Sequence, residues 1–143
     1  MKNIFAFFFL FISIHLFSNA KVWGQEKLIL AIDFQDFFNN DTLTLLINGD
    51  TVFQDIKVTS DKSLGQTKAK VRIFSTNSDK ISIIYNQKSI VTEYSQNIKV
   101  SVILNTFKRT YCVDPFNGIY IGFSKENNTG LTMVQTTNRF QYD

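Results

Sequence analysis

Histidine, cysteine, tryptophan and proline are nearly absent from this chain, which has one of each in 143 residues. The only histidine, His15, lies in an N-terminal stretch with the pattern of an export signal, so we expect no imidazole in the mature protein. Catalytic triads that depend on histidine and the histidine-rich ligand sets of catalytic zinc are thereby excluded. The single cysteine, Cys112, excludes an intramolecular disulfide, so the core must be stable without a covalent cross-link.

The N-terminal stretch has the three parts of a signal peptide. Lys2 supplies the basic start, an apolar run follows from residue 4 to residue 17, and small or polar residues come next. The run is shorter than the about 20 residues that cross a bilayer, so we expect cleavage. The predicted signal covers residues 1–20, with a cleavage site as late as residue 24, and no cysteine directly follows either site for lipid attachment. A secreted or periplasmic protein without a stable membrane anchor is expected.

No charge of one sign dominates the chain. Lysine and arginine exceed aspartate and glutamate by 15 to 12, and part of this excess leaves with the signal. We therefore expect no nucleic-acid partner. Residues 25–143 contain no linker rich in proline, glycine or serine, and their length favours a single domain.

Apolar residues recur at every second position along residues 25–143, and no stretch keeps helical spacing. This alternation predicts roughly eight or nine short strands at spacings of about ten residues. Each strand has one apolar face that needs cover, so the expected fold is all-β. We predict a two-sheet antiparallel sandwich, immunoglobulin-like or similar, with a small closed β-barrel as the alternative. Residues 139–142 are expected to close the sheet.

The clearest local signal is a hairpin around Asn48-Gly49, a pair typical of the two-residue type I′ turn. Counting outward from the turn places Leu45 opposite Val52. Ile56 and Val58 are then expected to continue the same face.

Two surface features could contact a ligand. Lys68, Lys70 and Arg72 alternate with apolar residues and predict a basic strand face. This face suits an acidic glycan or a lipid head group, or is simply a solvated edge guarded against pairing. Four aromatic residues bracket the turn predicted at residues 114–118 and would suit sugar stacking if exposed, or the core if buried. They are Tyr111, Phe116, Tyr120 and Phe123.

Carboxylates are the remaining candidates for chemistry. Two of them at a suitable separation would support glycoside hydrolysis, but most lie in predicted turns, where aspartate bonds to its own backbone. The candidates are Asp33, Asp36, Asp41, Asp50, Asp55, Asp61, Asp79, Glu93, Asp114 and Glu126. Oxygen-bearing residues around the first connection could also hold calcium, although their spacing does not match an EF-hand loop. These residues are Asp33, Asp36, Asn39, Asn40 and Asp41.

Cys112 is expected to be a small buried hydrophobe, because it lies in a predicted strand and nothing places a base beside its sulfur. Four short motifs match glycosylation acceptors. Asn40-Asp41-Thr42 and Asn127-Asn128-Thr129 fit the N-linked pattern, while Asp41-Thr42-Leu43 and Asp50-Thr51-Val52 resemble the O-linked acceptors of Bacteroidota.

The composition and the cleavage region resemble those of exported proteins from AT-rich bacteria of that phylum. The residues identify no catalytic, cofactor-binding or metal site. We therefore expect a non-catalytic binding or interaction module for a glycan or a cell-surface protein. The alternatives are a small carboxylate-dependent hydrolase and a structural subunit that assembles through edge strands, and the sequence predicts no oligomeric state.

Overall fold

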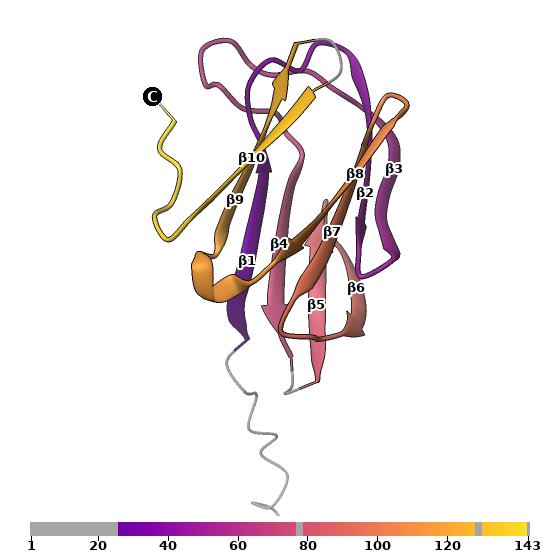
Figure 1. Cartoon of the computed structure of the whole chain (residues 1–143), viewed down its shortest axis with the longest axis vertical. Coiled ribbons are helices and arrows are strands. Elements are labelled where there is room, and N and C mark those ends of the chain that lie inside the picture. Colours follow the sequence, from indigo (N-terminus) through magenta and orange to yellow (C-terminus); the bar gives the residue numbers. More distant parts are fainter. Residues whose placement is uncertain (1–25, 77–78, 128–129, 143) are drawn as a thin grey trace, which may run out of the picture.

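The computed structural model describes residues 26–76, 79–127 and 130–142, and the expected signal peptide with its cleavage site lies outside them. The described residues form two β-sheets that pack face to face without closing into a barrel (Figure 1). The predicted two-sheet sandwich is therefore confirmed. Within the same residues, no helix has the length and hydrophobicity needed to cross a membrane.

One sheet has six strands in the order β10-β9-β1-β4-β5-β6, and the other has four in the order β3-β2-β7-β8. The strands are β1 (Lys27–Phe34), β2 (Asp41–Ile47), β3 (Asp50–Val58), β4 (Lys70–Ser75), β5 (Lys80–Tyr85), β6 (Lys88–Glu93), β7 (Ile98–Leu104), β8 (Phe107–Val113), β9 (Tyr120–Glu126) and β10 (Gly130–Thr136). A short 3-10 helix, η1 (Pro115–Asn117), joins β8 to β9. Neighbouring strands are antiparallel except β1 and β9, which run parallel.

Aromatic side chains tie the two sheets together in the core. Phe34 of β1 is fully buried and meets Phe53 of β3 in the facing sheet, with ring centroids 6.1 Å apart. Phe53 also packs on Tyr85 of β5, with ring centroids 4.6 Å apart. Burying a phenylalanine side chain contributes about 1.5–3 kcal/mol, so these contacts stabilise the packing of one sheet on the other.

The β2–β3 hairpin has the predicted turn but not the predicted register. Asn48 and Gly49 have φ values of 52° and 95°, the positive angles that a type I′ turn requires. Leu45 lies opposite Phe53, so the predicted pairing with Val52 is wrong. Val52 is the extra residue of a β-bulge, and the bulge turns the larger Phe53 side chain into the core.

A second irregularity in β3 lies near Asp55, which has a positive φ of 51°. The Asp55 N–H donates to Thr44 Oγ1 at 2.9 Å, so a side chain replaces the interrupted backbone pairing. Beyond this point Val58 is buried as expected, whereas Ile56 is only half-buried. The predicted apolar face therefore continues only in part.

The predicted half-buried basic strand is confirmed. Ala69, Val71 and Ile73 are buried, while Lys70 on the alternate face of β4 is exposed. β1 and β5 pair with β4 on its two sides, and the apolar face of β4 belongs to the core that both sheets share.

Residues 139–142 do not close a sheet, so this prediction is wrong. The edge position beside β9 is already taken by β10, and the chain then turns back as an irregular segment (Figure 1). Its end is fixed by Tyr142, whose Oη donates to Asp33 Oδ2 at 3.3 Å and accepts a hydrogen bond from Gln35 Nε2 at 3.1 Å. The terminal segment thus binds to β1 by side chains instead of extending the sheet.

Candidate functional site

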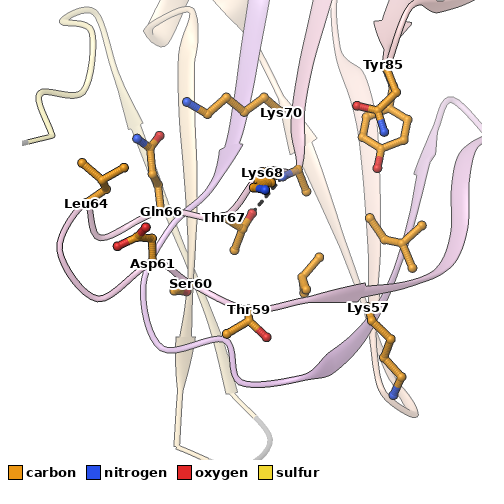
Figure 2. A pocket seen from close by; sticks show the side chains of 14 residues that line it. Lys57, Thr59, Ser60, Asp61, Leu64, Gln66, Thr67, Lys68, Lys70 and Tyr85 are labelled. Atoms are coloured by element: carbon orange, nitrogen blue, oxygen red, sulfur yellow. Dashed lines mark hydrogen bonds between the residues drawn. The ribbon is translucent and has the colours of Figure 1, made fainter.

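A hollow of about 710 Å³ opens between the end of β3, the loop of residues 59–69 and the end of β5, and we call it the β3–β5 hollow (Figure 2). Val58 and Ala69 form part of its apolar lining. Leu64 and Gln66 lie on one side of it and Tyr85 on the other (Figure 2). The hollow therefore brings together segments that are not adjacent in the sequence.

The wall on the loop side is a tight turn held by its own hydrogen bonds. Asp61 Oδ1 accepts from the N–H of Ser63 at 2.8 Å, and the Gly65 N–H donates to the Asp61 carbonyl at 2.9 Å. The hydrogen bonds from Ser63 lower the pKa of Asp61, although burial acts weakly in the opposite direction. Gly65 has a φ of 58°, and a Cβ there would lie 2.7 Å from Asp36 Oδ1. Glycine is thus required where this turn packs against the loop after β1.

Lys68 and Lys70 are the free cations at the hollow. Both are exposed, and no carboxylate among the described residues forms an ion pair with either. The Lys70 Nζ lies 5.6 Å from the centre of the Tyr142 ring. Lys57 also borders the hollow, but its Nζ is bound to Thr42 Oγ1 at 2.8 Å and points away (Figure 2).

The third member of the predicted basic face is not free. Arg72 Nη1 lies 2.8 Å from Asp33 Oδ1, and the Asp33 side chain is only 8% exposed. This ion pair neutralises the guanidinium, so the basic face reduces to Lys68 and Lys70.

Two threonine hydroxyl groups around the hollow accept hydrogen bonds from the backbone. Thr59 Oγ1 accepts from the Asn40 N–H at 2.9 Å, and Thr67 Oγ1 accepts from the Ala69 N–H at 3.0 Å. Gln66 Oε1 is buried and has no hydrogen-bond partner among the described residues. The two lysines supply positive charge for an acidic ligand, and the far wall supplies an aromatic ring.

The far wall is built from Tyr85 and Asn86 at the β5–β6 turn. Tyr85 is half-buried against Phe53, and this burial raises the pKa of its hydroxyl. An amphipathic ring of this kind offers an apolar surface and a polar tip to a ligand. No sequence pattern indicates this wall, because it depends on how the two sheets pack.

The two buried carboxylates among the predicted candidates, Asp33 and Asp41, are each held by a cation. Asp33 is held by Arg72, and Asp41 Oδ1 and Oδ2 lie 2.8 Å and 2.9 Å from Lys125 Nζ. Burial acts to raise the pKa of Asp41. Hydrogen bonds from Lys125, Asn105 and the Asn39 backbone together lower it by more, so the net shift of the pKa is downward. Each of the two buried carboxylates is thus paired with its own cation.

The possible calcium cluster around the first connection is not assembled either. Two of its members, Asp33 and Asp41, point their oxygens at different cations. Within residues 26–76, 79–127 and 130–142, no group of three or more His, Cys, Asp or Glu side chains is placed to hold a metal ion.

Cys112 is exposed, so the prediction of a buried thiol is wrong. Its neighbours take the inward positions of β8: Val113 is buried, and Tyr111 packs on Phe123 with ring centroids 5.3 Å apart. Strand alternation then turns Cys112 outward, on the face where Lys99 is its partner in β7.

The four aromatic residues around the predicted turn separate into two groups. Phe123 is fully buried, while Tyr111 and Tyr120 are half-buried. Phe116 is 83% exposed on η1, where Asp114 Oδ1 accepts from the Phe116 N–H at 2.9 Å. They do not form a shared stacking surface.

The glycosylation motifs differ in accessibility. Asn40, Thr51 and Asn127 are exposed, whereas Asp41 is buried and Thr42 accepts the hydrogen bond from Lys57. The other two residues of the motif at Asn127 lie outside the described part of the chain.

No protein-family model, curated protein or solved structure matches this chain. The candidate site therefore depends on its own geometry: two unpaired lysines beside a hollow with one aromatic wall.

Proposed function

We propose that this chain is an exported, non-catalytic binding module and that the β3–β5 hollow takes an acidic saccharide. The observation that carries the proposal is the pair of exposed lysines, Lys68 and Lys70, at the mouth of a hollow; neither forms an ion pair with a described residue, although the charge of Lys68 acts on Asp61 in the same lining. Their ammonium groups can bind the carboxylate or sulfate of an acidic sugar. Tyr85 offers an apolar ring on which a sugar face can pack.

The proposal is tested with an array of acidic and neutral saccharides, followed by calorimetric titration of those retained. Replacing both lysines in a Lys68→Gln, Lys70→Gln variant should weaken binding of an acidic saccharide about threefold to thirtyfold, the range for two solvent-exposed ion pairs. Added salt should weaken wild-type binding in the same way.

A matched control removes two exposed lysines from the outer face of the four-stranded sheet, with the changes Lys99→Gln and Lys108→Gln. This variant has the same net charge and should keep its affinity. Equal losses in both variants, or retention of neutral saccharides alone, would contradict the lysine site. If the array retains nothing, the saccharide proposal fails and a cell-surface protein becomes the ligand to seek.

Export is tested separately by sequencing the N-terminus of the mature protein. A start at residue 21 or residue 25 supports cleavage of the expected signal. An intact Met1 in a membrane fraction contradicts it.

A further inference from the structure

Of the four sheet edges in the described part of the chain, β3 and β8 carry features that hinder pairing with another strand, and β10 has one carbonyl covered. Two bulges interrupt β3, and β8 carries Lys108 and Arg109 within its length. The side chains of Arg109 and Tyr111 donate to the Leu131 carbonyl of β10 at 3.1 Å and 3.2 Å. Bulges, charges and covered backbone groups are the usual protection of an edge strand.

The fourth edge, β6, has no such protection in its middle. Between Lys88 and Glu93 it contains only uncharged residues, the segment 89–92, and three of these are β-branched. Val91 is 59% exposed on the outer face of the sheet, and Ile90 packs partly against the core. This composition favours strand pairing.

The β5–β6 turn determines which backbone groups of β6 are free. Asn86 and Gln87 have positive φ angles of 45° and 64°, and the turn pairs Tyr85 with Lys88. In a two-residue hairpin this closing pair exchanges both backbone hydrogen bonds, and every second pair does so thereafter. Ile90 therefore bonds to β5.

It follows that the N–H and C=O groups of Ser89 and Val91 point away from β5. Glu93 has the same orientation, but its carbonyl already accepts from Asn48 Nδ2 at 3.1 Å. The free edge of β6 is thus a short stretch centred on Ile90.

We propose that β6 pairs antiparallel with β6 of a second copy of this chain, so that two six-stranded sheets join edge to edge. In this register Ile90 lies opposite the second copy's Ile90, and Ser89 lies opposite the second copy's Val91. Every outward N–H and C=O of Ser89 and Val91 then gains a partner. The Asn48–Glu93 hydrogen bond is left intact.

Charge favours a second copy in this orientation. Antiparallel pairing brings Lys88 of one copy and Glu93 of the other to the same end of the junction, whereas parallel pairing would place like charges together. The half-buried Ile90 meets its own counterpart and continues the apolar layer across the junction. A two-fold pair of this kind closes on itself, because both copies contribute the same edge, β6, to the junction.

Hydrogen exchange with sedimentation velocity tests the proposal on the saccharide-free chain, so the result does not depend on the proposed ligand. The amides of Ser89 and Val91 should gain protection as protein concentration rises and dimers form. The amides of Ile90 and Thr92, which bond to β5, should be protected at every concentration and serve as internal controls.

A Val91→Pro variant removes only an outward N–H and should weaken dimerisation about tenfold or more. Val91→Thr keeps the N–H and should dimerise like the wild type, and the melting temperature of each variant checks its folding. A wild-type chain that stays monomeric at all concentrations would overturn the proposal. A Val91→Pro dimer as tight as the wild type, or assemblies that grow beyond a dimer, would overturn it as well.

Discussion

The ion pair between Lys125 and Asp41 joins one sheet to the other inside the sandwich, so breaking it should lower the free energy of unfolding by a measurable amount. Lys125 comes from β9 and Asp41 from β2, and their side chains are 13% and 6% exposed. Lys125→Met would keep the length of the side chain and remove its charge, so Asp41 would be left as a buried carboxylate without a cation. Breaking such a pair typically costs about 3–5 kcal/mol. Since Asn105 Nδ2 and the Asn39 N–H still donate to Asp41, we expect a loss of about 3 kcal/mol in the free energy of unfolding.

Urea denaturation of three variants measures this loss. Lys125→Met is compared with a variant that also carries Asp41→Asn, in which no buried charge remains, and with Lys108→Met at an exposed position. The double variant should recover about 1–3 kcal/mol relative to Lys125→Met alone. The exposed control should change stability by no more than about 0.5 kcal/mol.

Acid titration adds a second readout for the same pair. The pKa of Asp41 is lowered from its ordinary value of 3.8, so its contribution to stability is complete above that pH. This contribution is lost as the pH falls below 3.8 through the folded-state pKa. Two results would refute a costly unpaired charge at Asp41. One is a loss below about 1 kcal/mol in the free energy of unfolding of Lys125→Met. The other is a Lys125→Met, Asp41→Asn variant that is no more stable than Lys125→Met alone.

Three further outcomes are expected. Cys112 is exposed, so a thiol reagent should label the folded protein as fast as the urea-unfolded chain, and slow labelling that speeds up only on unfolding would contradict the outward orientation. Gln66→Met removes a buried acceptor that has no partner among the described residues. Urea denaturation should therefore show a free energy of unfolding that is unchanged or raised by up to about 1–3 kcal/mol. A clear loss of stability would mean that Gln66 Oε1 has a hydrogen-bond partner. Burial raises the pKa of Tyr142 above its ordinary value of 10.0, so the free energy of unfolding should fall as the pH rises through and above that value. Tyr142→Phe should reduce this fall. The same dependence of stability on pH in the variant and the wild type would argue against the buried phenol.

Strand positions could be predicted from the sequence because side-chain alternation fixes both the period and the buried face. Leu30 and Ile32 of β1, for example, are fully buried as that pattern requires. Alternation does not identify the buried face of a strand when the side chains on both faces are apolar. Tyr111, Cys112 and Val113 follow one another in β8, and only the packing of Tyr111 on Phe123 shows which of them point inward.

The parts of the site that were missed depend on tertiary packing. The Val52 bulge cannot be read from the turn, because it forms where Phe53 gains more burial than a regular register would allow. In the same way, the predicted basic face could not reveal that Arg72 is neutralised by a carboxylate from another strand. Tyr85 becomes a wall of the hollow only after the two sheets have packed.

The parallel pairing of β1 with β9 determines when folding can be completed. The Ala31 N–H donates to the Ile119 carbonyl and the Gln35 N–H donates to the Phe123 carbonyl, both at 2.7 Å. These acceptors are synthesised about 90 residues after their donors, so a growing polypeptide cannot complete the centre of its larger sheet before residue 123. Contacts between such distant segments also make folding slow, typically in milliseconds to seconds for β-sandwiches. The larger sheet of a nascent chain therefore stays incomplete until β9 has been synthesised, which is compatible with the export proposed above.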